Sequence, residues 1–141
     1  MSKIALGTVQ FGIDYGINSE NGQVQPEEVR SILNYAHSQN IDLLDTAPAY
    51  GNSEKVLGVT NVQNFKVVTK TRHFESFEIK NTDVKLLNND FHHSLKDLKQ
   101  NSVYGVLIHD ADDLLKPGAE KLFDKLQELK QAEKIVKIGV S

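Results

Sequence analysis

Three ionisable residues each close a short apolar run, and their types could do chemistry together. Asp45 ends the run IDLLD, Lys70 ends FKVVTK, and His109 follows YGVLI. Because an unpaired buried carboxylate is costly, we expect Asp45 to lie at a strand mouth beside a cation. Tyr50 follows Asp45 within a turn of small residues and is the fourth candidate. The sequence therefore predicts a polar site formed by residues that are distant along the chain.

These four side chains suit a site that polarises and protonates a carbonyl oxygen. A phenol donates a proton slowly unless a nearby ammonium stabilises the phenolate. In this scheme Asp45 orients Lys70, and Lys70 stabilises the Tyr50 phenolate. His109 donates a second hydrogen bond to the substrate oxygen. The chain has no cysteine, and no serine elbow or second carboxylate is placed as a nucleophile. We therefore expect the nucleophile to be a hydride from a nicotinamide cofactor.

The elements that position these residues alternate between strand and helix. Residues 9–25, with three glycines, are predicted as loop, and Pro26 followed by two glutamates is typical of a helix start. Asn40 is a plausible cap for that helix. Apolar patterning predicts the remaining elements. They are strands over 4–8, 41–45, 65–70, 104–108 and 135–140, and helices over 26–36, 53–57 and 81–98 and after Gly118.

This alternating order with short connections predicts a parallel α/β sheet, for which two architectures compete. A doubly wound nucleotide-binding fold should carry a glycine-rich phosphate loop, and the chain has neither GxGxxG nor a Walker lysine motif. A (β/α)8 TIM barrel places its chemistry at the carboxyl ends of its strands, as in this pattern. Because residues two apart share a face of a strand, we expect Asp45, Lys70 and His109 to converge at the barrel mouth.

Composition limits the classes of partner and compartment. The chain has 141 residues, enough for the single domain that we assign to residues 1–141, and a net charge of −3. That charge argues against nucleic acid or an anionic membrane as a partner. The cysteine-free composition suits the cytoplasm, and we expect no signal peptide, membrane-spanning segment or metal site.

Five segments together resemble the aldo-keto reductase family of NAD(P)H-dependent (β/α)8 barrels. They are LGTVQFG at 6–12, DTAPAYGNSEKVLG at 45–58, VVTKT at 67–71, SLKDLKQNSVYGVLIHD at 94–110 and IVKIGVS at 135–141. The opening ALGTVQFGIDYGI further resembles a bacterial branch associated with surface-polysaccharide biosynthesis.

The resemblance implies a cofactor, a substrate class and residue roles. The cofactor would be NADPH or NADH, and the substrate a small carbonyl compound. The family's catalytic tetrad corresponds to Asp45, Tyr50, Lys70 and His109. The Gly-Thr pair beside the nicotinamide ribose corresponds to Gly7 and Thr8, and the serine that holds the carboxamide corresponds to Ser141.

The chain departs from the family in length, because such barrels need roughly 250 residues. We expect the N-terminal half of a barrel, about four and a half βα units, without the cofactor-anchoring strands six to eight. This suggests a truncated gene product, a proteolytic fragment or a deliberately shortened chain. We expect this half to be inactive alone, because the cofactor-anchoring half is missing. The alternative function is a non-catalytic half-barrel, structural or vestigial, that self-associates through its open sheet edges and apolar inner face.

Overall fold

Five parallel strands form one sheet in the computed structural model, which describes residues 4–16, 22–60 and 62–141. Each strand pairs with the next one along the chain, so the order across the sheet is the order in the sequence. The α/β class and the parallel sheet predicted from the sequence are confirmed. The strands are β1 (Leu6–Gly7), β2 (Leu43–Asp45), β3 (Lys66–Lys70), β4 (Val103–Ile108) and β5 (Ile135–Val140).

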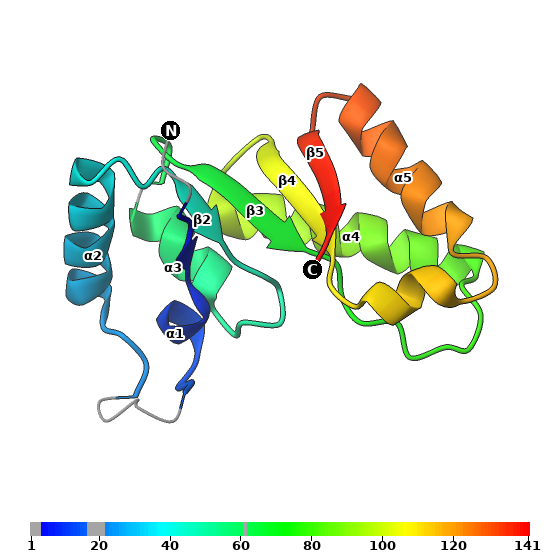
Figure 1. Ribbon diagram of the computed structural model, residues 1–141, viewed down its shortest axis with the longest axis horizontal. Coiled ribbons are helices and arrows are strands. Elements are labelled where there is room, and N and C mark those ends of the chain that lie inside the picture. Colours follow the sequence, from blue (N-terminus) through cyan, green and yellow to red (C-terminus); the bar gives the residue numbers. More distant parts are fainter. Residues whose placement is uncertain (1–3, 17–21, 61) are drawn as a thin grey trace.

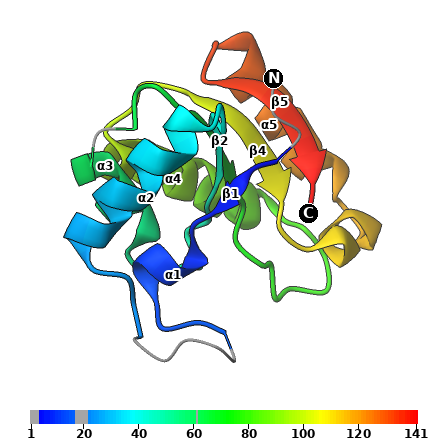
Figure 2. The same ribbon diagram turned by 60° about the vertical axis from the view of Figure 1, so that its left-hand side comes forward.

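The main helices lie on one side of this sheet, as Figures 1 and 2 show. Consecutive parallel strands joined by right-handed crossovers place every connecting helix on the same face. The opposite face carries no helix in the described part of the chain and faces the viewer in Figure 1. The helices are α1 (Val9–Gly12), α2 (Pro26–Ser38), α3 (Ser53–Thr60), α4 (Asn81–Leu98), the 3-10 helix η1 (Ala111–Leu115) and α5 (Glu120–Gln131).

The hydrophobic core lies between the sheet and the helices. On the strands, Leu44, Val67 and Val106 point into it and are at most 2% exposed. The long helices contribute apolar stripes, among them Leu98 of α4 and Leu122 of α5, which are buried as well. The amphipathic patterns in the sequence therefore correspond to one core on the helical side of the sheet.

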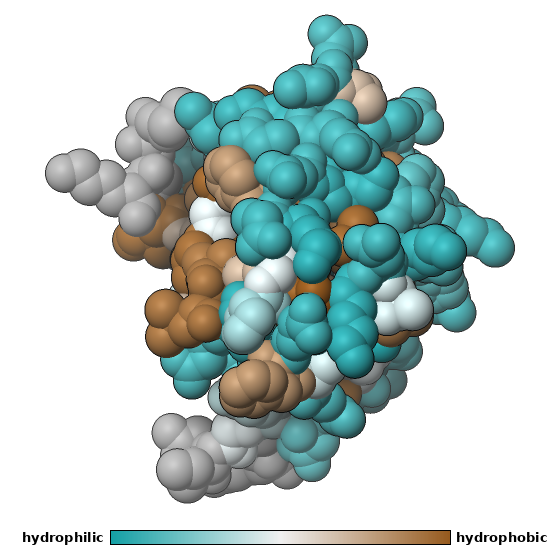
Figure 3. Space-filling model, turned by 90° about the vertical axis from the view of Figure 1, so that its right-hand side faces the viewer, coloured by the Kyte–Doolittle hydropathy of each residue, from teal (hydrophilic) through white to brown (hydrophobic). Residues whose placement is uncertain are grey.

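The helix-free face is also apolar, but it is only partly covered. Leu43, Val68 and Leu107 alternate with core residues along their strands and are of intermediate exposure. Figure 3 looks onto the side of α5 and β5, where the surface is mostly hydrophilic. Hydrophobic side chains gather along its left edge, which is the side that faces the viewer in Figure 1. This face would form the interior of a closed barrel.

Several boundaries differ from the sequence prediction. The strand predicted over 4–8 pairs only at Leu6 and Gly7, and the second strand begins at Leu43 rather than Ile41. Residues 9–12, predicted as loop, form the one-turn helix α1. The helix predicted over 53–57 continues to Thr60, and η1 was not predicted. These short elements depend on contacts with distant residues, which local patterning does not contain.

Candidate active site

Three of the four candidate catalytic residues lie along one rim of the sheet. Asp45 ends β2, Lys70 ends β3, and His109 directly follows β4. Asp45 is paired with Val68, two residues before Lys70. Lys70 is paired with Leu107, two residues before His109. Because residues two apart on a strand share a face, the three side chains form a staggered row on the helix-free face.

The Lys70 ammonium joins the other members of this group. Its Nζ atom lies 2.7 Å from both carboxylate oxygens of Asp45 and 3.2 Å from Tyr50 Oη. It also donates to the main-chain carbonyl of Thr46 at 3.1 Å. The Lys70 side chain is 4% exposed, against 35% for Asp45. A buried, fully paired cation beside a phenol oxygen is the arrangement that stabilises a phenolate.

His109 also lies close to the phenol ring of Tyr50. Its ring centroid is 6.2 Å from that of Tyr50, and the two rings meet edge to face. Burial, the neighbouring His73 and the Lys70 ammonium hold the pKa of the His109 imidazole below its ordinary value. His109 Nδ1 is buried, and no described residue forms a hydrogen bond with it. The ring is therefore neutral near pH 7, with one nitrogen as donor and the other as acceptor.

A chain of buried hydroxyl groups fixes the turn that carries Tyr50. Thr46 Oγ1 donates to Ser53 Oγ at 3.2 Å, and Ser53 Oγ donates to the Thr8 main-chain carbonyl at 2.9 Å. Thr8 Oγ1 in turn donates to the Asp45 main-chain carbonyl at 2.9 Å. The three hydroxyl-bearing residues are fully buried. These bonds join the ends of β1 and β2 to the start of α3, on either side of Tyr50.

Two glycines allow α1 to pack against the same turn. A Cβ atom at Gly12 would clash with the main-chain oxygen of Tyr50 and with Ser53. Gly51 has a φ of +59°, in the left-handed region, and approaches the main chain of Gly12. Close backbone packing and the hydroxyl chain therefore both hold the Tyr50 turn in place.

The three predicted cofactor-binding residues lie near the same rim but differ in what they present. Gly7 pairs with Asp45 and is exposed, and a Cβ atom there would meet nothing within 4 Å. Ser141 follows β5, is exposed, and donates its N–H to the Ile108 carbonyl at 2.9 Å. Thr8 is fully buried with its hydroxyl engaged, so its side chain presents no polar group to the mouth.

Glu54 is a buried acid that the sequence analysis did not single out. It lies on α3, is 5% exposed, and accepts a hydrogen bond of 2.6 Å from Thr69 Oγ1. Burial raises the pKa of the Glu54 carboxyl, although hydrogen bonds from Thr69 and Ser94 act in the opposite direction. Because Thr69 directly precedes Lys70, this bond anchors α3 to β3 behind the site.

His73 was also missed, although it lies only three residues beyond Lys70. Its ring centroid is 4.4 Å from that of His109, with the planes inclined by 33°. Its Nδ1 atom lies 3.5 Å from Asp110 Oδ2. The sequence itself shows that His73 lies close to the end of the strand predicted over 65–70. Its contact with His109, 36 positions away, depends on the path of the loop after β3.

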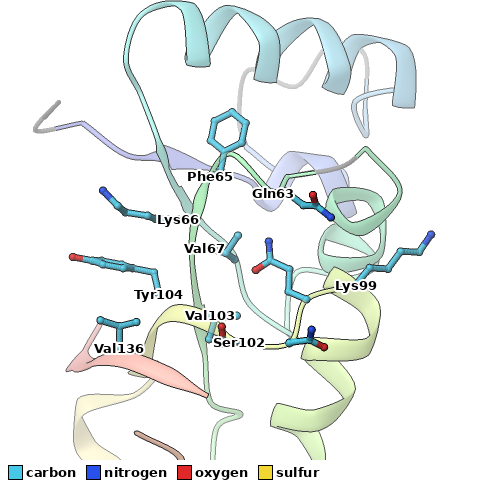
Figure 4. A pocket seen from close by; sticks show the side chains of 11 residues that line it. Gln63, Phe65, Lys66, Val67, Lys99, Ser102, Val103, Tyr104 and Val136 are labelled. Carbon is cyan, nitrogen blue, oxygen red and sulfur yellow. The ribbon is translucent and has the colours of Figure 1, made fainter. Parts of the chain in front are cut away.

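Other features of the described residues lie apart from this group. No cluster of three His, Asp or Glu side chains suited to a metal ion occurs among them, nor does any described helix have the length and hydropathy to span a membrane. A cavity of about 400 Å³ lies at the opposite, N-terminal ends of β3 and β4 (Figure 4). Its lining includes Lys66, which lies 5.7 Å from the Tyr104 ring centroid. This cavity is therefore separate from the rim that holds the candidate catalytic residues.

Comparison with known families gives one match over nearly the whole chain. A sequence model described as Aldo/keto reductase family matches residues 3–141. None of the curated proteins matches the chain in sequence.

Solved structures of aldo-keto reductases are similar to the chain over about half of their own length. A Pseudomonas aeruginosa protein described as an aldo-keto reductase superposes with a TM-score of 0.80 at 28% identity, covering 97% of this chain and 54% of that one. Glycerol dehydrogenase AKR11B4 from Gluconobacter oxydans gives a TM-score of 0.72 at 25% identity, covering 99% and 44%. Aldo-keto reductase AKR11C1 from Bacillus halodurans, at 20% identity and a TM-score of 0.73, supports the fold alone, covering 99% and 46%. The prediction of a half-barrel is confirmed.

Proposed function

The chain belongs to the aldo/keto reductase family, and we propose that it carries the catalytic half of an NAD(P)H-dependent carbonyl reductase. The observation that supports this proposal is the position of Lys70 Nζ between the Asp45 carboxylate and Tyr50 Oη. In this assignment Tyr50 is the general acid, Lys70 stabilises its phenolate, and Asp45 holds Lys70 in place. These roles are the ones expected from the residue types, and the family resemblance implies the same four residues as the catalytic tetrad.

His109 supplies the second hydrogen bond in this mechanism. Because Nδ1 is buried without a partner among the described residues, we assign the ring proton to Nε2. The Nε2–H group then donates to the substrate carbonyl oxygen without giving up its proton. Proton delivery is left to Tyr50, whose hydroxyl protonates the developing alkoxide.

The nicotinamide cofactor, NADPH or NADH, supplies a hydride when bound. The open space above Gly7, next to Asp45, fits a flat ring at the mouth, and we assign Gly7 and exposed Ser141 to its binding. Thr8 is fully buried, and its N–H and hydroxyl both donate to the Asp45 main-chain carbonyl, so we propose that it supports the mouth beside Gly7 rather than contacting the cofactor. The chain spans about half the length of its structural relatives, so we propose that residues 1–141 alone neither hold the cofactor tightly nor turn over.

A chimeric barrel tests the catalytic assignment. Residues 1–141 would replace the matched 54% of the Pseudomonas aeruginosa relative, and oxidation of NADPH by an aromatic aldehyde would be followed at 340 nm. Tyr50→Phe should lower kcat about 10²- to 10⁴-fold, the usual contribution of a general acid, and leave the Kd for NADPH nearly unchanged. Exposed Tyr35 on α2 offers a matched control, Tyr35→Phe, which should keep full turnover. Undiminished turnover in Tyr50→Phe would show that another group is the acid.

The second candidate function is a non-catalytic half-barrel that self-associates. Its support is the partly exposed apolar face around Leu107, together with the open edges of the sheet at β1 and β5. Light scattering after size exclusion should then give a mass above 15.8 kDa for residues 1–141. Leu107→Glu should shift the chain toward monomer, whereas Phe123→Glu on the outer surface of α5 should not. A monomer at high protein concentration would contradict this proposal.

Finer assignments follow from the sequence. The cysteine-free composition supports a cytoplasmic location, and the opening segment supports the branch associated with surface-polysaccharide biosynthesis. In that assignment the substrate is a small carbonyl compound. Neither nucleic acid nor membrane is proposed as a partner.

A further inference from the structure

We propose that His73 is a positioning residue for His109. Its ring lies between Asp110 and the His109 imidazole and keeps that imidazole in the neutral form that donates a hydrogen bond. This inference rests on the proposed function, because it concerns the residue that donates to the substrate oxygen. It is carried by the contact of the two rings, whose centroids are 4.4 Å apart, and by the 3.5 Å separation of His73 Nδ1 from Asp110 Oδ2.

Both neighbours of His73 in the chain are anchored, so its place at the rim is fixed. Arg72 Nη2 donates to Asp90 Oδ1 on α4 at 2.9 Å. Phe74 is 3% exposed, and its N–H donates to the buried carboxylate of Asp113 at 3.3 Å. The loop after β3 is therefore held on either side of His73. The His73 side chain is still 55% exposed, so it is open to the mouth rather than part of the core.

The contact places a second titratable ring against His109. When His73 is protonated, its charge disfavours a proton on His109, and it is the second-largest cause, after burial, that lowers the pKa of His109. Asp110 faces His73, with its Oδ2 atom 3.5 Å from His73 Nδ1. The consequence is that His109 stays neutral to lower pH than burial alone would allow.

The other groups around His109 come from three further segments. Those with a charge or titratable group are Asp45 on β2, Tyr50 in the following turn and Lys70 on β3. Lys70 repels a proton on His109, and Asp45 attracts one. The effect of Lys70 is the larger of the two, although the pair is separated by only 2.7 Å. Among these neighbours, His73 has the largest effect on the pKa of His109.

A neutral His109 leaves hydrogen-bond donation and proton delivery to two different residues of the site. Its Nε2–H can donate a hydrogen bond to a carbonyl oxygen while Tyr50 delivers the proton. A protonated His109 would place a second acid at the same oxygen and a second cation beside Lys70. His73 therefore preserves the distinction between hydrogen-bond donor and proton donor toward lower pH.

Histidine NMR on the 141-residue chain tests this proposal without requiring turnover. The Cε1–H signals of the five histidines would be followed from pH 4 to 9, with His109 assigned by substitution. His73→Phe keeps an aromatic ring against His109 but removes the charge, and the His109 titration should move to higher pH. His73→Gln, which also removes the ring, should move it in the same direction and abolish the ring-to-ring NOE.

The matched control is His93→Gln. His93 Nε2 lies 3.4 Å from Asp97 Oδ2 on α4, so the control removes a similar histidine–aspartate pair away from the rim. It should leave the His109 titration unchanged. An unmoved His109 titration in both His73 variants, or an equal shift in the control, overturns the proposal. That result would not affect the catalytic assignment, which fails only if Tyr50→Phe retains turnover.

Discussion

Replacing Asp45 with asparagine should destabilise the chain more than replacing Lys70 with methionine. The two charges are separated by 2.7 Å, where Coulomb's law with an effective dielectric constant of about 20 gives an attraction of about 6 kcal/mol. This attraction offsets the cost of burying the ammonium. The burial is unequal, since the Lys70 side chain is 4% exposed and that of Asp45 is 35% exposed. Removing the carboxylate therefore leaves the more deeply buried charge unpaired.

The expected sizes follow from this asymmetry. Breaking a buried pair costs about 3–5 kcal/mol, and the partial exposure of Asp45 reduces this to about 3 kcal/mol for Asp45→Asn. Lys70→Met leaves a carboxylate that water can reach and should cost about 1–2 kcal/mol. The double variant leaves no unpaired charge, so it should be more stable than Asp45→Asn alone. Urea unfolding followed by far-UV circular dichroism at pH 7 measures all four free energies, against typical domain stabilities of about 5–15 kcal/mol.

The chain contains a matched control for this cycle. Lys66 Nζ and Asp42 Oδ2 are 2.9 Å apart, but both side chains are more than a third exposed. Asp42→Asn should therefore change the free energy of unfolding little, and that change should disappear at high salt. The double variant at the rim should lose less free energy of unfolding than the two single variants lose together. A loss equal to their sum would refute the predicted pairing. Additivity of that kind would mean that the two charges are already solvated independently.

Three further predictions concern the packing behind the site. Ser53→Ala should cost about 1–3 kcal/mol in urea unfolding, because it leaves buried hydroxyl and carbonyl partners unsatisfied, whereas the exposed Ser31→Ala should cost much less. Gly12→Ala should cost about 1–3 kcal/mol or more, since α1 must move away from the Tyr50 turn, and unchanged stability would contradict the close packing. The pKa of Glu54 is raised in the folded chain, so its favourable contribution is present below its unfolded pKa and is lost as pH rises through the folded value. Glu54→Gln should therefore gain stability relative to the wild type as pH rises, and parallel stability curves would contradict this.

The sequence was sufficient for features that depend on local periodicity and on the ends of strands. Pro26 begins α2 as predicted, and Asn40 adopts a φ of +58° just beyond the end of that helix. The convergence of Asp45 and Lys70 was predictable, because alternation fixes the face on which each side chain lies. The 2.7 Å distance between Lys70 Nζ and Asp45 Oδ1 also depends on the register of β2 against β3, which local sequence patterns do not predict.

Features that depend on contacts between distant loops were not predictable in the same way. The one-turn helix α1 has little propensity of its own and forms where Gly12 meets the Tyr50 turn. Threonine and serine are residue types that are usually exposed. Thr8 and Ser53 are nevertheless fully buried, and they form hydrogen bonds with each other across 45 positions of the chain. Each such contact depends on the conformations of two loops, so the sequence of either loop alone does not predict it.

The candidate active site and the candidate association surface share one face of the sheet. Lys70 is two residues beyond Val68, and His109 is two residues beyond Leu107, so each site residue continues a row of half-buried apolar side chains. A second copy packed over those apolar residues would also restrict access to the rim above them. Association and cofactor binding by residues 1–141 should therefore compete, and NADPH should bind more tightly to Leu107→Glu if that variant is the more monomeric form. Equal affinity in the two forms would mean that the rim lies clear of the surface between copies.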